Sequence, residues 1–146
     1  LAGGYLRGLK IYDNILKCNY TGSDDHWHFS IELFGIEGGN EIYGNTCVGT
    51  IDYSGYVGND GVNDDAGYGY AVKIYENTLG CDAPADFETY GVTFERSLEG
   101  GTYIYRNIIR NVQAGLTFSN PSDGANWRDV YVYNNLIYLH QSSMCL

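Results

Sequence analysis

The chain has 146 residues, a length that suits a single domain. Its formal net charge of −10, with only 8 lysine and arginine residues, disfavours nucleic acid and anionic membranes as partners. No stretch is long and apolar enough for membrane insertion. The 20 glycines and the many β-branched and aromatic residues favour strands over helices.

A short motif, Ile-Tyr-x-Asn, recurs five times along the chain, with valine replacing isoleucine in the last copy. The copies are Ile11-Tyr12-Asp13-Asn14, Ile42-Tyr43-Gly44-Asn45, Ile74-Tyr75-Glu76-Asn77, Ile104-Tyr105-Arg106-Asn107 and Val132-Tyr133-Asn134-Asn135. From asparagine to asparagine, the steps are 31, 32, 30 and 28 residues. A near-constant period of this length is typical of a structural unit stacked on copies of itself.

Each copy predicts a strand that ends at the tyrosine, a tight turn, and a second strand. The x position is Asp, Gly, Glu, Arg or Asn, so strand alternation stops there and the chain turns. We expect the asparagines to pair their side-chain amides from coil to coil, and the tyrosines to stack in an outward ladder. Two positions after each asparagine, an inward column is predicted from Leu16, Cys47, Leu79, Ile109 and Ile137.

A third strand is predicted between consecutive asparagines, from an apolar-polar-apolar pattern. The segments are Ile31-Glu32-Leu33, Ile51-Asp52-Tyr53, Val92-Thr93-Phe94 and Leu116-Thr117-Phe118. About five coils of about three short strands each then form one all-β solenoid domain over residues 1–146. The longest irregular stretch, residues 54–68, is predicted to be an inserted loop.

This pattern resembles the right-handed parallel β-helix proteins, the architecture of pectate lyases, polygalacturonases and phage tailspikes. The likeness rests on the five repeats, the apolar column and the intervening strands, and it spans roughly residues 9–139. It implies right-handed coiling and an extracellular or cell-surface protein that acts on polysaccharide. No catalytic signature of those families is matched, so no catalytic residue carries over.

Carboxylates fall on the side of the third strand set that should point outward. Because Ile31 and Leu33 point in, Glu32 should point out, with Asp52 on the next coil roughly 5 Å away. Repulsion between such carboxylates favours one protonated acid beside one ionised base, the pair that glycoside hydrolysis uses. Glu32, Asp52 and Glu95 are therefore the candidate catalytic residues. Solvated surface and a calcium ion shared by the first two are the alternatives.

Aromatic and cationic side chains are candidate substrate contacts. Tyr43, Tyr75 and Tyr105 offer apolar rings with polar tips, although stacking between coils is the alternative explanation for them. Trp27 stands between two histidines, and Arg96 follows Glu95. Packing of a loop is the alternative for Trp27, and an ion pair with its neighbour is the alternative for Arg96.

Residues 59–65 are dense in oxygen ligands, and Asp60, Asp64 and Asp65 are candidate ligands of Ca²⁺. The spacing is not that of an EF-hand, and a plain polar insertion is the alternative.

The four cysteines, Cys18, Cys47, Cys81 and Cys145, are expected to be buried thiols. Cys18 and Cys81 fall two coils apart, beyond the usual reach of a disulfide. Bending of a loop that joins either of them to Cys47 is the alternative.

Two functions remain open at this point. The first is an extracellular β-helix that binds polysaccharide or cleaves it, by hydrolysis or by lyase chemistry. The second is a non-enzymatic structural or adhesive solenoid. Because the repeats run close to both termini with no amphipathic helix to cap them, unpaired strand edges are expected. Such a chain would stack end to end with copies of itself into filaments, or be a segment of a longer β-helix.

Overall fold

The computed structural model describes residues 8–18, 29–36, 38–55, 72–81, 90–94, 101–118 and 129–139. Within these ranges the chain forms 14 β-strands and no helix, and the strands make three parallel sheets. This is the all-β parallel β-helix that the repeats predict. No described segment is a helix that is long and apolar enough to span a bilayer.

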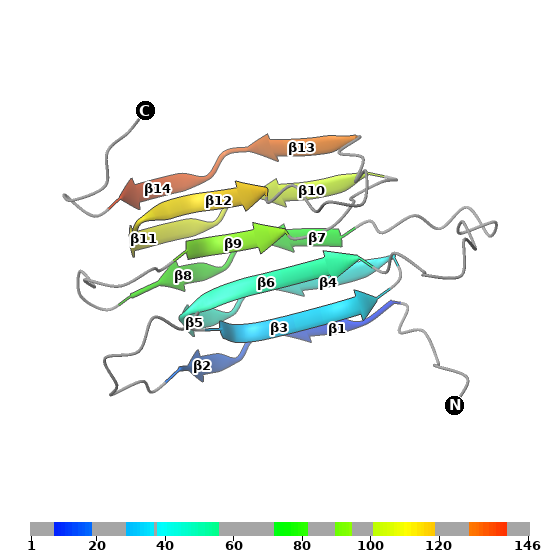
Figure 1. Ribbon diagram of the computed structural model, residues 1–146, viewed down its shortest axis with the longest axis horizontal. Helices are drawn as coiled ribbons and strands as arrows, with labels where there is room; N and C mark the ends of the chain where they lie inside the picture. Colours follow the sequence, from blue (N-terminus) through cyan, green and yellow to red (C-terminus); the bar gives the residue numbers. More distant parts are fainter. Residues whose placement is uncertain are drawn as a thin grey trace.

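The three sheets run along the stack, and each repeat contributes a strand to sheets A and B (Figure 1). Sheet A contains β1 (Lys10–Tyr12), β4 (Asn40–Tyr43), β7 (Val72–Tyr75), β10 (Thr102–Tyr105) and β13 (Val130–Tyr133). Sheet B contains β2 (Ile15–Lys17), β5 (Thr46–Val48), β8 (Thr78–Gly80), β11 (Ile108–Val112) and β14 (Leu136–Leu139). Sheet C contains β3 (Phe29–Ile36), β6 (Thr50–Gly55), β9 (Tyr90–Phe94) and β12 (Ala114–Phe118).

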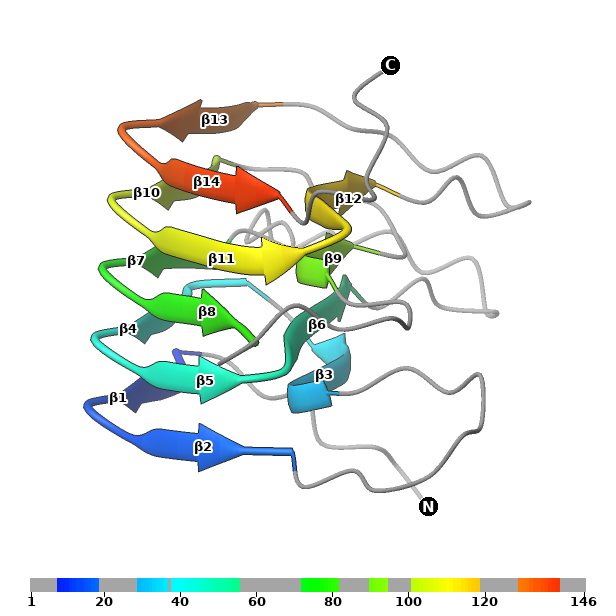
Figure 2. The same cartoon turned by 90° about the vertical axis from the view of Figure 1, so that its left-hand side faces the viewer.

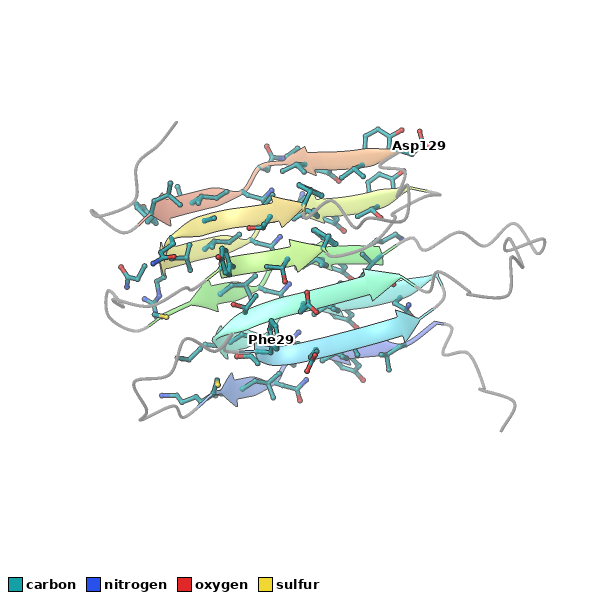
Figure 3. All side chains as sticks on the ribbon, in the orientation of Figure 1. Phe29 and Asp129 are labelled. Carbon is teal, nitrogen blue, oxygen red and sulfur yellow. The ribbon has the colours of Figure 1, made fainter. Side chains whose placement is uncertain are left out.

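The chain winds around the stack in a right-handed sense. In Figure 2 it passes from β4 behind to β5 in front and then to β6 at the right, while later rungs lie higher. Figure 3 labels one residue on the first rung and one on the last. Phe29 begins β3 on the first rung, and Asp129 directly precedes β13 on the last.

The turn between sheets A and B sits at the x residue of every repeat, as predicted. Its backbone has φ of 55° at Asp13, 56° at Glu76, 55° at Arg106, 55° at Asn134 and 65° at Gly44. This left-handed conformation bends the chain sharply between two strands. Because all five residues are exposed at the corner, residue type is free to vary there.

The core lies between the sheets and is built from aligned columns. On sheet A, Ile42, Ile74 and Ile104 are 0% exposed, and Ile109 on sheet B is equally buried. Sheet C aligns the predicted segments column by column, with Ile31 beside Ile51, then Val92, then Leu116. Each apolar side chain therefore packs against its equivalent on the next rung, which removes it from water.

Two predictions need correction, one about the inserted loop and one about the cysteines. Strand β6 continues to Gly55, so the first two residues of the predicted loop 54–68 are strand, and the rest of that loop lies outside the described residues. Cys47 is buried as predicted, but the thiols of Cys18 and Cys81 are only half-buried because they lie at strand ends. Cys145 lies outside the described residues.

Candidate functional site

The outer face of sheet A carries two parallel columns of side chains. Because Ile42, Ile74 and Ile104 point into the core, strand alternation sends their neighbours on both sides outward. One outward column is the tyrosine of each repeat: Tyr12, Tyr43, Tyr75, Tyr105 and Tyr133. The other stands two residues earlier and contains Lys10, Glu41, Lys73, Tyr103 and Tyr131. We call the two columns together the tyrosine face.

The tyrosine rings stack flat upon one another along the whole ladder, as predicted. Successive ring centroids are 4.9–5.1 Å apart and the ring planes differ by only 2–6°. Tyr103 and Tyr131 stack in the same way in the second column, 4.9 Å apart. Each interior ring therefore has a neighbour on both of its flat sides, and what it presents to solvent is its edge and its hydroxyl.

The phenolic hydroxyls of this face are hydrogen-bond donors. The Tyr75 hydroxyl donates to Oε2 of Glu41 at 2.9 Å, which links the two columns. Desolvation, reinforced by the nearby Glu41 carboxylate, raises the pKa of Tyr75, and desolvation also raises the pKa of Tyr105. Phenols are already protonated at neutral pH, and these shifts extend the protonated range of the two hydroxyls further towards alkaline pH.

Charged groups on and beside the tyrosine face occur in opposite pairs. Lys10 lies 3.6 Å from Glu41 on the neighbouring strand, and Lys73 stands next to Glu41 in register on the other side. At the corner, Arg106 lies 3.1 Å from Glu76. These contacts are exposed, and pairs of this kind contribute little to stability. On the face itself, Lys10 and Lys73 stand on either side of the Glu41 carboxylate, so the two cations do not form a cluster.

The predicted acid neighbours are adjacent in sheet C, but they do not form an exposed row. Glu32 pairs with Asp52, and Asp52 pairs with Thr93 on the following rung. Glu32 is exposed. Asp52 and Thr93 are each only 1% exposed, and the Thr93 hydroxyl donates to Oδ1 of Asp52 at 2.5 Å. The expectation that Asp52 points outward beside Glu32 on an exposed row is therefore wrong. Alternation decides on which side of a sheet a residue lies, but not whether that side is covered.

Six of the predicted site residues lie outside the described residues: Trp27, Asp60, Asp64, Asp65, Glu95 and Arg96. Among the residues that the structure does describe, no three His, Cys, Asp or Glu side chains gather closely enough to hold a metal ion.

The structure also adds residues that the sequence predictions did not single out. The column of Lys10, Glu41, Lys73, Tyr103 and Tyr131 stands beside the predicted tyrosine ladder. The sequence does contain a signal for this column, since each member precedes its repeat tyrosine by two residues, the period of a strand. Its members differ in residue type, and for that reason the repeat alone does not reveal the column.

Comparisons of the chain with protein-family models, with curated proteins and with solved structures give no match. The chemistry of the tyrosine face therefore has to be inferred from its own residues.

Proposed function

We propose that this chain is an extracellular β-helix that binds a neutral, extended polysaccharide along the tyrosine face of sheet A. The observation that carries the proposal is the pair of adjacent columns on one sheet face, with a stacked tyrosine on every rung. A polymer that lies parallel to the stack meets the same group at each rung, so that many weak contacts add up along its length.

The contacts expected on this face are made by ring edges and hydroxyls. The flat sides of Tyr43, Tyr75 and Tyr105 are occupied by neighbouring rings, so a sugar does not stack on them. The column instead offers one phenolic hydroxyl per rung to the sugar hydroxyls, and each can donate or accept, except that Tyr75 donates to Glu41 and is left as an acceptor. The apolar ring edges suit the C–H groups of the sugar.

The charges favour a neutral glycan over an acidic one. Lys10 and Arg106 each lie beside a carboxylate, Lys73 is a register neighbour of Glu41, and the chain as a whole carries a formal charge of −10. A uronic acid polymer meets no uncompensated cationic cluster on this face, and the negative protein repels it over longer distances.

Depletion from solution by insoluble cellulose, chitin and xylan tests the proposal, with immobilised polygalacturonate as the acidic comparison. We expect binding to at least one neutral polymer and weaker binding to the acidic one. Replacement of Tyr43, Tyr75 and Tyr105 by Phe keeps the stacked rings and removes three hydroxyls. Since each net hydrogen bond contributes about 0.5–1.5 kcal/mol, affinity should fall at least about tenfold.

A matched control removes hydroxyls from another face. Thr46 and Thr78 stand on sheet B as register partners, next to the inward Cys47 and Leu79, and both are changed to Val. This variant should bind as the original chain does. The proposal fails if no polymer is retained, or if the Phe variant binds as tightly as the Thr46→Val, Thr78→Val control.

Cleavage of the glycan is the second candidate function. One observation favours it: Glu32 and Asp52 pair across adjacent strands, which brings an exposed carboxyl next to a buried one. Such a contrast of environments is a way to separate an acid from a base. The burial of Asp52 and its hydrogen bond from Thr93 favour binding over cleavage as the main proposal.

A further inference from the structure

The last described rung, β13 and β14, exposes side chains that belong to core columns. Val132 is 47% exposed and Ile137 is 39% exposed. Their register partners one rung earlier, Ile104 and Ile109, are both 0% exposed. This end of the stack therefore presents one half of the interface that otherwise joins each rung to the next.

The first rung, β1 and β2, presents the other half of the same interface. Tyr12 is 49% exposed, and one side of its ring has no tyrosine neighbour within the described ladder. Oδ1 of Asn45 accepts from the backbone N–H and from Nδ2 of Asn14, yet among the described residues nothing donates to Oδ1 of Asn14. The equivalent side-chain oxygen, Oδ1 of the repeat asparagine, accepts hydrogen bonds on every later rung.

At the opposite end of the stack, Asn135 carries a backbone N–H and a side-chain Nδ2, the two donors that Oδ1 of Asn14 lacks. Oδ1 of Asn135 accepts from the backbone N–H and from Nδ2 of Asn107, as on every other rung. Nδ2 of Asn135 donates to backbone carbonyls, but within the described residues neither this group nor its backbone N–H reaches a further asparagine. The two ends of the asparagine ladder are therefore complementary.

We propose that the two ends bind each other, so that β1 and β2 of a second copy of the chain pair in parallel with β13 and β14 of the first. The register seen four times within the chain then continues across the junction. Asn135 donates to Asn14 of the next copy, Tyr133 stacks on Tyr12, and Val132 packs on Ile11. Because the two surfaces differ and lie at opposite ends, the association is head to tail and open-ended. It does not depend on glycan binding.

A second copy fits these ends better than an unrelated protein does. Any partner has to offer a parallel strand, a stacked tyrosine and an amide oxygen at one spacing, and β1–β2 carries all three in the right order. Exposed strand edges of this kind are known templates for pairing with another chain.

Sedimentation velocity of the 146-residue chain over a wide concentration range, without glycan, tests the proposal. We expect the mean sedimentation coefficient to rise steadily with concentration, with short filaments visible by negative-stain microscopy. A monomer at every concentration would overturn the proposal, and so would a closed dimer that grows no further.

A pair of substitutions at Tyr131 provides a sharper test. Tyr131 shares a column with Lys10, and in the proposed junction it lies next to Lys10 of the following copy. Tyr131→Glu places opposite charges there, as between Lys10 and Glu41 within the chain, and Tyr131→Lys places like charges. Both changes lose the same ring contact with Tyr103, so each serves as the folding control for the other.

The Glu variant should associate roughly threefold or more tightly than the Lys variant at low salt. This difference should shrink at high salt, because the two charges are exposed and screened. Equal association of the two variants, with both folded by circular dichroism, would show that the junction is not the one described.

Discussion

Oδ1 of Asn77 accepts two hydrogen bonds from Asn45, one from the backbone N–H and one from Nδ2, both at 3.0 Å. The Asn77 amide in turn donates to Oδ1 of Asn107 and to the carbonyl of Ile42, again at 3.0 Å. The same pattern recurs from Asn14 to Asn135. One side chain on each rung thus satisfies buried backbone groups on the turn while it joins two rungs.

Replacement of Asn77 by Ala should therefore be severely destabilising. The side chain is 1% exposed, and its loss removes the acceptor of the Asn45 backbone N–H and the donor to the Ile42 carbonyl, both on the preceding rung. At about 1–3 kcal/mol for each buried unsatisfied group, we expect a loss of roughly 3–5 kcal/mol or failure to fold. Urea unfolding monitored by circular dichroism measures the loss.

Asn14→Ala is the matched control, because Asn14 occupies the same column on the exposed first rung. Asn14 is itself exposed, and after the change Oδ1 of Asn45 still accepts from the backbone N–H of residue 14. The expected cost is therefore only about 1 kcal/mol. Equal costs at the two positions would contradict a role for the ladder in satisfying buried groups.

Alkaline pH should destabilise the fold partly through Cys47. Burial raises the pKa of this thiol from 9.0 to about 11. The folded state therefore keeps a proton that the unfolded chain loses. The stability that follows is fully present below pH 9.0 and is lost as pH rises towards about 11. Over that window the loss attributable to Cys47 should be roughly 2–3 kcal/mol.

The measurement compares urea unfolding of the original chain and of Cys47→Val at pH 8.5 and at pH 11. Tyrosine titration affects both proteins, so the difference between them isolates the thiol. The Val variant should lose less stability across the window. If the two proteins lose the same amount, burial of the thiol in the folded state is not what sets its proton affinity.

The corner between sheets B and C depends on a glycine at position 91. A Cβ added to Gly91 would meet the carbonyl oxygen of Gly115 and lie 3.0 Å from Cδ1 of Ile109. A backbone oxygen cannot move aside, so Gly91→Ala should cost roughly 1–3 kcal/mol through overpacking. Thermal and urea unfolding report the change.

Gly115→Ala tests the same corner one rung later. The added methyl there meets the side chain of Ile137, which is 39% exposed and able to shift. We expect a clearly smaller loss than at Gly91. A larger loss of stability for Gly115→Ala than for Gly91→Ala would contradict the proposed clash at Gly91 with the Gly115 carbonyl oxygen.

The carboxyl pair of sheet C gives the prediction for catalysis. If the chain cleaves a glycan through these groups, Glu32→Gln and Asp52→Asn should each reduce the release of reducing sugar at least about a hundredfold. Asp52→Asn also weakens the contact with Thr93, so unfolding curves must accompany the assay. Full activity in both variants would eliminate the acid pair, whereas glycan binding by the tyrosine face would be unaffected.

Much of the fold can be predicted from the sequence because a solenoid repeats local information. The position of an asparagine within its coil determines its register with the next asparagine, so five copies of Ile-Tyr-x-Asn predict both ladders. The apolar-polar-apolar segments predict sheet C in the same way, and the pairing of Ile31 with Ile51 confirms it. Residue spacing is sufficient for these features, since each depends only on neighbouring rungs.

The sequence by itself determined the period, the order of the strands and the columns of equivalent side chains. The tertiary structure alone decided which side chains of these columns reach solvent. Asp52 is buried although alternation places it opposite the core, whereas its register partner Glu32 is exposed. Exposure depends on what packs around a residue in three dimensions, and no spacing along the chain encodes that.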